Sequence, residues 1–188
     1  MDENQLDYTG SELKGKTIGI IGLGAIGQEV ASFCRVFDMN VQAYARKAVV
    51  KSEDVVKMTD FDTLISTSDI VSVHIPLNQQ IKQLINKNAF KKMRNTTLFT
   101  NTARGGIVNE RDLIDALKNA DISGACLDAF ESEPLPMDSE LRNLSNVILT
   151  PHTAGMPDGR KFHKIRYDFF INNIKRVENG EEPESKFN

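Results

Sequence analysis

Apolar residues in this chain occur in short continuous runs, which alternate with longer segments where apolar residues recur every three or four positions. Runs of the first kind predict buried strands, and the second spacing predicts helices. Because the runs do not alternate strictly between apolar and polar residues, we expect both faces of the sheet to be covered. The six runs span residues 16–22, 40–45, 69–77, 95–103, 122–130 and 146–151.

The helical period is clearest in two segments between these runs. The later segment begins at Asn109, a residue type favoured as an N-cap. The apolar residues at helical spacing are Ile26, Val30, Phe33 and Phe37 in segment 25–37, and Leu113, Ile114 and Leu117 in segment 109–120. Strands that alternate with helices predict an α/β fold, a Rossmann-type doubly wound parallel sheet with helices on both faces.

A glycine-rich stretch, "GLGAIG", joins the first strand to the first helix. Gly22 would allow the tight turn out of the strand, and Gly24 would let a pyrophosphate approach the backbone. Gly27 would let the helix lie close to the sheet. The helix N-terminus, which includes Ala25 and Ile26, would then offer its free N–H groups to the phosphates. In this strand-to-helix context the motif predicts dinucleotide binding rather than a simple turn.

The second strand lacks the acidic residue that binds the adenosine ribose in many such folds. Its end reads "AYARK", so Arg46 and Lys47 stand where that acid is expected. Two cations suit a 2′-phosphate, and NADP is therefore favoured over NAD as the cofactor. The alternative is that both are solvated loop charges and that Asp54 or another group compensates.

Three further strands are each followed by residues suited to catalysis. Arg104 follows the run 95–103. Asp128 lies near the end of the run 122–130, and Glu133 comes shortly after that run. His152 directly follows Pro151, the last residue of the run 146–151. Because the carboxyl ends of parallel strands meet at one edge of a sheet, we expect these side chains to lie beside the glycine loop.

Reduction of a ketone by hydride requires a proton for the developing alkoxide, and histidine suits that task near neutral pH. We therefore interpret His152 as the acid/base, with Glu133 favouring its imidazolium form and fixing its orientation. Arg104 would hold a substrate carboxylate, and Asp128 could position the nicotinamide carboxamide. Taken singly, each residue has a structural alternative, as a surface charge, a turn residue or a packed histidine.

Further cofactor contacts are expected at neighbouring strand ends, from His74, Pro76, Thr102 and Ala103, and from His152 itself. A short-chain dehydrogenase is disfavoured, because that class needs a lysine four residues after a tyrosine. Tyr8, Tyr44 and Tyr167 are followed at that spacing by Glu12, Ala48 and Ile171.

Composition narrows the function classes further. The chain has 188 residues, 40% of them hydrophobic and 26% charged, with a formal net charge of −3. These values suit one soluble domain and argue against nucleic acid as a partner. No apolar run is long enough to span a membrane, and the acidic N-terminus does not resemble a signal peptide. Cys34 and Cys126 have no metal-type spacing and are expected to be small buried hydrophobes, so a cytoplasmic protein without a metal site is expected.

The chain resembles the D-2-hydroxyacid dehydrogenases, including the phosphoglycerate dehydrogenases and the glyoxylate and hydroxypyruvate reductases. The resemblance rests on "ELKGKTIGIIGLGAIG", "SDIVSVHIPL", "TARGGIVNE", "GACLDAFESEPLP" and "NVILTPHTAG". It implies an Arg–Glu–His catalytic set, here Arg104, Glu133 and His152, with Asp128 at the nicotinamide. It also implies an NAD(P)-dependent enzyme, usually a homodimer, that acts on small 2-hydroxy or 2-oxo acids.

Family members have a further segment before the part that begins here near Leu6, and it builds most of a flavodoxin-like substrate domain. We therefore expect a dinucleotide-binding domain over residues 1–155, and a C-terminal helix and tail over 156–188 that would return to the substrate domain. Some apolar side chains of that helix would then be partly uncovered, and such a surface favours association of the chain with a partner. These apolar residues are Phe162, Ile165, Phe169, Phe170 and Ile174. Slow or absent turnover is expected. The alternative function is a truncated, non-catalytic dinucleotide-binding module, which would be a gene remnant, a sensor or a scaffold.

Overall fold

The computed structural model describes residues 10–45, 56–155 and 160–184. The chain divides into two compact units, Met1–His152 and Thr153–Asn188, and each is described by itself. Leu6, Arg46, Lys47, Asp54 and the side chain of Phe162 lie outside the described residues.

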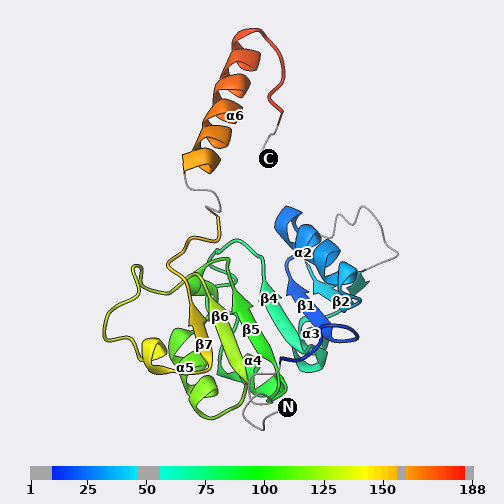
Figure 1. The fold of residues 1–188 in the computed structure, drawn as a ribbon, viewed down its shortest axis with the longest axis vertical. Coiled ribbons are helices and arrows are strands. Elements are labelled where there is room, and N and C mark those ends of the chain that lie inside the picture. Colours follow the sequence, from blue (N-terminus) through cyan, green and yellow to red (C-terminus); the bar gives the residue numbers. More distant parts are fainter. Residues whose placement is uncertain (1–9, 46–55, 156–159, 185–188) are drawn as a thin grey trace, which may run out of the picture. The chain divides into compact units, whose positions relative to one another are not determined.

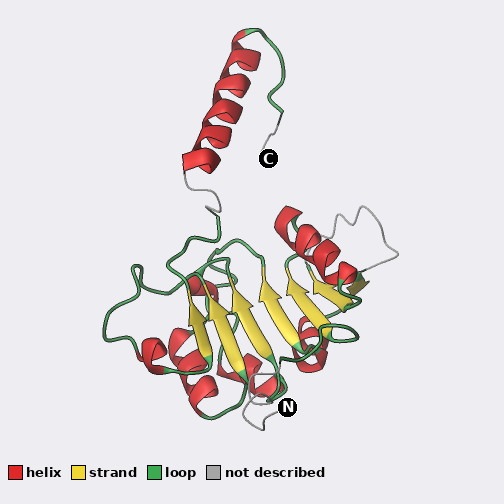
Figure 2. Cartoon of the chain, in the orientation of Figure 1, coloured by secondary structure: helices red, strands yellow, loops and turns green. Residues whose placement is uncertain are grey.

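The first unit is built on a seven-stranded sheet in which every pair of neighbouring strands is parallel. The strands lie in the order β3-β2-β1-β4-β5-β6-β7, and their arrowheads point to one edge (Figure 2). This confirms the predicted Rossmann-type doubly wound α/β fold. The strands are β1 (Thr17–Ile21), β2 (Asn40–Tyr44), β3 (Lys57–Met58), β4 (Ile70–Val73), β5 (Leu98–Asn101), β6 (Gly124–Leu127) and β7 (Val147–Leu149).

Helices cover both faces of the sheet (Figure 1). The larger core lies between one face and the helices α3 (Phe61–Thr67), α4 (Lys87–Lys92) and α5 (Glu110–Lys118). On the other face, α2 (Ala25–Val36) packs on β1 and β2 around a smaller core. Two short 3₁₀ turns, η1 (Gly105–Ile107) and η2 (Glu140–Asn143), complete the unit.

Polar N-caps start three of these helices. The side chains of Asp60, Asn86 and Asn109 each accept a hydrogen bond from a backbone N–H of the following turn. The bond from Thr63 also lowers the pKa of Asp60. The prediction of Asn109 as an N-cap is therefore confirmed, and so is the burial of Leu113, Ile114 and Leu117 on one face of α5.

The structure corrects the prediction in two places at the sheet. Six strands were expected, but β3 is a seventh, and its two residues are too few to form an apolar run. The prediction that both faces of the sheet are covered is also wrong at β5 and β7, where Leu98 and Ile148 are exposed. Both side chains lie on the face that carries α2, whose main contacts are with β1 and β2.

The first helix is present as expected, and Val30 is half-buried and packs against the smaller core. The other three of its predicted apolar residues do not face the sheet. Ile26 and Phe33 are 69% and 64% exposed, and Phe37 is also exposed. Gly27 and Ala31 form the buried side instead, because the close contact between α2 and the sheet leaves room only for small residues. Cys34 and Cys126 are free and half-buried rather than fully buried, and burial raises the pKa of both thiols.

The second unit contains α6 (Arg160–Glu178), a helix of 19 residues. Its described apolar side chains include Ile165, Phe170 and Ile174, which are exposed as the sequence predicts. No helix in the described parts of the chain is long and apolar enough to cross a membrane.

Candidate active site

The glycine loop lies at the point where the strand order of the sheet reverses, between β1 and β4. Gly22 follows β1 with a φ of 101°, in the region that favours glycine. A Cβ on Gly22 would lie 2.6 Å from the carbonyl oxygen of His74, so the end of β1 and the end of β4 are in close contact. In parallel α/β sheets, ligands bind at such a reversal point, outside the carboxyl ends of the strands.

The three glycines of the loop serve different purposes. A Cβ on Gly27 would overlap the carbonyl oxygen of Gly22, so Gly27 is needed for the packing of α2 on the loop. A Cβ on Gly24 would meet no protein atom within 4 Å. Gly24 is the N-cap of α2 and provides no side-chain cap, and Ala25 and Ile26 beside it are exposed. The open space at Gly24 and the free N–H groups of α2 fit the pyrophosphate of a dinucleotide.

A second feature fits the adenosine half of the same ligand. A hollow of about 200 Å³ lies past the end of β2 and is bounded by side chains that are mostly apolar. They are Tyr44, Ala45, Ile75, Pro76, Gln80, Ile81 and Leu84. A flat aromatic ring could pack there, beside the end of β2.

The structure brings His152 and Glu133 into direct contact. The His152 Nδ1 and Glu133 Oε2 atoms are 2.7 Å apart, and both side chains are partly exposed. A bond of 3.0 Å from the Phe130 N–H to Glu133 Oε1 is the main reason that the pKa of Glu133 is lowered. The His152 contact lowers this pKa further, as does the positive charge of Arg104. Because Glu133 is ionised at neutral pH, Nδ1 must carry the shared hydrogen, and Nε2 is left for a ligand.

The pair lines a hollow of about 220 Å³, whose other lining residues include Leu135, Arg142 and Leu149. His152 has a φ of 54°, in the left-handed region that histidine adopts at a cost. The tight turn after β7, in which the His152 N–H bonds to the Thr150 carbonyl at 3.0 Å, holds this backbone in place.

Arg104 lies in the turn that leads from β5 into η1. It is exposed, and its Nη1 donates a hydrogen bond of 2.6 Å to the Ala103 carbonyl. Thr102 is exposed and Ala103 is half-buried in the same turn. The influence of Arg104 on the pKa of Glu133 shows that its charge is felt at the His152–Glu133 pair.

Asp128 follows β6 and is only 2% exposed. The Thr150 hydroxyl donates a hydrogen bond of 2.6 Å to its Oδ1, and its own N–H donates to the Asn101 carbonyl at 3.0 Å. These bonds fix the carboxylate at the edge of the sheet between β5 and β7. Its buried position makes Asp128 a fixed acceptor rather than a mobile surface charge.

The ring of His74 contacts a hydroxyl group rather than a carboxylate. Its Nε2 lies 2.8 Å from the Ser72 hydroxyl, and burial lowers the pKa of its ring, which is therefore neutral at neutral pH. Pro76 is exposed and lines the hollow past β2. Both residues thus stand on the glycine-loop side of the sheet edge, apart from the pair formed by His152 and Glu133.

Sequence reasoning missed two residues that support the site, Asn101 and Thr150. Asn101 lies within the predicted strand run 95–103, and Thr150 lies within the run 146–151. The available signal was a polar residue at the end of a buried strand. In the described ranges, no three His, Cys, Asp or Glu side chains are placed to hold a metal ion.

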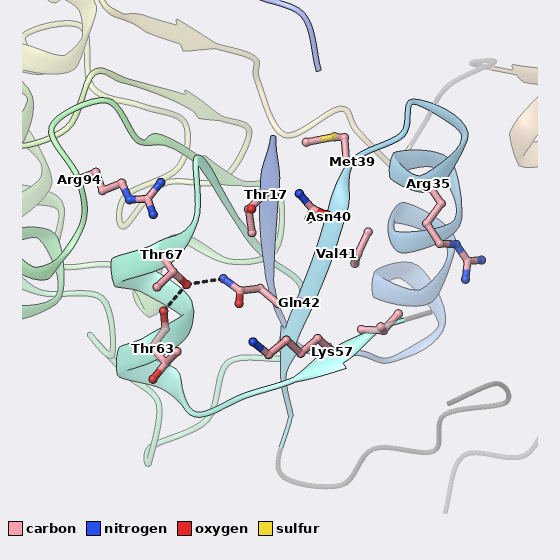
Figure 3. A pocket seen from close by; sticks show the side chains of 11 residues that line it. Thr17, Arg35, Met39, Asn40, Val41, Gln42, Lys57, Thr63, Thr67 and Arg94 are labelled. Carbon is pink, nitrogen blue, oxygen red and sulfur yellow. Dashed lines mark hydrogen bonds between the residues drawn. The ribbon is translucent and has the colours of Figure 1, made fainter. Parts of the chain in front are cut away.

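A broader hollow of about 800 Å³ lies at the opposite edge of the sheet (Figure 3). Thr17 and Asn40, the first residues of β1 and β2, are part of its lining. Its buried Gln42 donates a hydrogen bond of 2.8 Å to Thr67, a contact that joins β2 to α3. The hollow is therefore remote from the glycine loop and from the His152–Glu133 pair.

Comparisons with known proteins identify the family of the chain. The model of the family "D-isomer specific 2-hydroxyacid dehydrogenase, NAD binding domain" matches residues 2–154. The chain is 46% identical over 154 residues to a glyoxylate reductase of Thermofilum pendens, across 80% of this chain and 45% of that protein.

Solved structures show the same fold. A D-lactate dehydrogenase with NAD⁺ from Lactobacillus jensenii has a TM-score of 0.85 at 28% identity, over 98% of this chain and 61% of that one. An NADPH-dependent glyoxylate/hydroxypyruvate reductase from Sinorhizobium meliloti, in complex with NADP and sulfate, has a TM-score of 0.84 at 27% identity. That match covers 95% of this chain and 57% of the reductase.

Proposed function

The chain belongs to the family of D-isomer specific 2-hydroxyacid dehydrogenases, and we propose that it is the coenzyme domain of an NAD(P)-dependent oxidoreductase. The reaction would transfer hydride between nicotinamide and C2 of a small 2-hydroxy or 2-oxo acid. The chain spans less than half the length of the glyoxylate reductase it matches, so the activity is stated as a proposal. The contact of 2.7 Å between His152 and Glu133, at the sheet edge that carries the glycine loop, is the observation that carries the proposal.

The residues of the pair divide the acid/base task between them. Glu133 holds the Nδ1 hydrogen of His152, which leaves Nε2 to give a proton to the developing alkoxide or to take one from the hydroxyl. The ionised Glu133 also stabilises the imidazolium that forms in the second case. The nicotinamide, when bound, supplies or accepts the hydride.

Arg104 and Asp128 would orient the two reactants. The Arg104 guanidinium can fork onto a substrate carboxylate, which sets the carbonyl beside it toward the pair. Asp128, held by Thr150 and by the backbone of Asn101, would accept a hydrogen bond from the nicotinamide carboxamide. Contacts with the rest of the cofactor are assigned to Gly22, Gly24, Ala25, Ile26, Gly27, His74, Pro76, Thr102 and Ala103.

We propose NADP as the preferred cofactor. The support is the "AYARK" stretch after β2, where Arg46 and Lys47 replace the expected acid and could bind a 2′-phosphate. Relatives of similar fold were solved with either cofactor, NAD⁺ in the D-lactate dehydrogenase and NADP in the reductase.

We further propose that residues 1–155 form the dinucleotide-binding domain and that 156–188 return to a substrate domain. The exposed apolar side chains of α6, among them Phe170 and Ile174, support the second part. A homodimer is proposed from the exposed apolar residues of α2, such as Ile26 and Phe33. A cytoplasmic location, with neither nucleic acid nor membrane as partner, is proposed from the composition and net charge.

Steady-state kinetics with NADPH and glyoxylate or hydroxypyruvate test the proposed function. We expect His152→Ala to lower kcat by about 10²–10⁴-fold, the usual contribution of a general acid/base. Arg104→Ala should mainly raise KM, whereas His163→Ala, a substitution on α6, serves as the matched control. Cofactor binding without any turnover would favour the alternative, a non-catalytic dinucleotide-binding module.

A further inference from the structure

Asn101 is a buried polar residue that the proposed mechanism does not use. It is the last residue of β5 and is 1% exposed. Its Oδ1 accepts a hydrogen bond of 3.1 Å from the Ala103 N–H, and its Nδ2 donates one of 3.0 Å to the Arg104 carbonyl. Its own carbonyl accepts a bond of 3.0 Å from the Asp128 N–H. One residue therefore holds the backbone of the Arg104 turn and the start of the Asp128 loop.

We propose that Asn101 is a positioning residue that sets the place of Arg104 relative to Asp128, and so the place of the substrate carboxylate relative to the nicotinamide. The inference rests on the proposed function, in which Arg104 binds that carboxylate. Both halves of the amide are required, because the turn presents one N–H and one carbonyl. If Asn101 lost either bond, the Ala103 N–H or the Arg104 carbonyl would be left without its hydrogen-bond partner.

The turn is also held on its other side. A Cβ on Gly105 would overlap the backbone of Phe130 and Glu131, so Gly105 lies directly against that peptide. The N–H of Phe130 is the group that binds Glu133. Arg104 thus lies in a turn of three residues between a fixed point at Asn101 and a fixed point at Gly105. Its backbone is therefore held against the loop that follows β6 and carries both Asp128 and Glu133.

The side chain of Arg104 is exposed while its backbone is held. Its Nη1 donates to a carbonyl of the same turn rather than to a carboxylate. A long side chain reaches a ligand reproducibly only when its Cα is fixed. Loss of the Asn101 bonds should therefore weaken binding of a substrate carboxylate before it affects binding of the cofactor at the glycine loop.

Two variants of Asn101 and one control test this inference. Asn101→Asp keeps the acceptor for the Ala103 N–H and loses the donor to the Arg104 carbonyl, and Asn101→Ala removes both. Gln42→Glu is the matched control, because Gln42 is also a buried amide whose Nε2 donates to Thr67 and to Ser68. It lies in the hollow at the opposite edge of the sheet (Figure 3), so it reproduces the cost of a buried carboxyl without touching the turn.

The first readout is hydrogen exchange of the Ala103 amide in the chain without ligand. We expect exchange about tenfold faster in Asn101→Ala, as one lost hydrogen bond implies, and no change in Gln42→Glu. The second readout is the affinity of the NADP-loaded chain for oxalate, a two-carbon analogue of a 2-oxo acid. Asn101→Asp should weaken oxalate binding about tenfold and leave NADPH affinity within about threefold of the wild type.

The two readouts separate the possible failures. Unchanged Ala103 exchange in Asn101→Ala, or unchanged oxalate affinity in Asn101→Asp, overturns the positioning role. Equal weakening of oxalate and NADPH binding also overturns it, since that result is expected of general destabilisation. If the wild-type chain does not bind oxalate at all, the proposed function is contradicted, and the exchange of the Ala103 amide still decides whether Asn101 holds the turn.

Discussion

His152 and Glu133 are 19 residues apart in the sequence, and their Nδ1 and Oε2 atoms lie 2.7 Å apart. The contact exists because β6 and β7 are neighbouring parallel strands, so the loops that follow them leave the sheet at the same edge. A second bond, from the Phe130 N–H, holds the other carboxylate oxygen of Glu133. The imidazole is thus oriented by a carboxylate that is itself fixed by the backbone.

Cofactor binding should depend on the absence of a side chain at Gly24. Gly24→Ser places a Cβ and a hydroxyl in space that no protein atom occupies, and serine is a favourable N-cap for α2. We expect an unchanged melting temperature and a loss of NADPH affinity of at least about tenfold. Isothermal titration calorimetry measures the affinity. Gly10→Ser, where an added Cβ also meets no atom, is the control. Equal affinity in the two variants would show that the phosphates do not approach Gly24.

The carboxyl of Glu133 should titrate below its ordinary pKa of about 4.5, chiefly because the Phe130 N–H binds it. A folded-state pKa that is lowered contributes stability above the unfolded pKa, and this is lost as the pH falls through the folded value. We therefore expect Glu133→Gln to make unfolding less steeply dependent on pH below about 4.5. Carbon NMR of the side-chain carboxyl measures the pKa directly. His152→Ala should retain part of the shift. A midpoint at or above 4.5 would contradict this account.

The choice between the two nicotinamide cofactors should depend on Arg46. Arg46→Asp removes a cation that would bind the 2′-phosphate and restores an acid for the ribose hydroxyls. We expect the preference to change from NADPH to NADH, with a loss of NADPH affinity of roughly tenfold to hundredfold. Fluorescence titration of both reduced cofactors measures the ratio, and Arg35→Asp on α2 is the charge-matched control. Equal affinities for the two cofactors in the wild type would defeat the assignment of NADP.

The exposed apolar residues of α2 should hold two copies of the chain together. Phe33→Glu adds a charge in the centre of the set formed by Ile26, Phe33 and Phe37, and should shift the chain to a monomer. Sedimentation velocity over a range of concentrations measures the change. Met137→Glu, at an exposed apolar residue outside α2, is the control and should leave the distribution unchanged. A wild-type chain that is monomeric at high concentration would contradict the proposed dimer.

Much of the fold could be predicted because its signals are local. The strand runs and the N-cap Asn109 depend on residues close in the sequence, and both are confirmed. The strand β3 was missed because two residues carry no period. The outward face of α2 was missed for a different reason, since the size of the space under a helix depends on the loop that packs against it.

The site was predictable only as far as topology determines it. Parallel strands place Arg104, Glu133 and His152 at one edge, but the contact between two of them depends on the register of β6 and β7. The contact of Gly22 with His74 likewise requires β1 to pair with β4, and β2 and β3 lie between these two strands in the sequence. The bonds of Asn101 leave only one signal in the sequence, a polar residue at the end of a buried strand, and that signal does not name its partners.

The transfer of an isotopic label from cofactor to substrate tests the central claim most directly. The chain is incubated with glyoxylate and with NADPH that carries deuterium at both positions of the nicotinamide C4, and the glycolate formed is examined by mass spectrometry. We predict glycolate with one deuterium on C2, formed slowly by the wild type and by His163→Ala. His152→Ala should form it about 10²–10⁴-fold more slowly. Glycolate without deuterium, or equal formation by His152→Ala, would contradict hydride transfer assisted by His152.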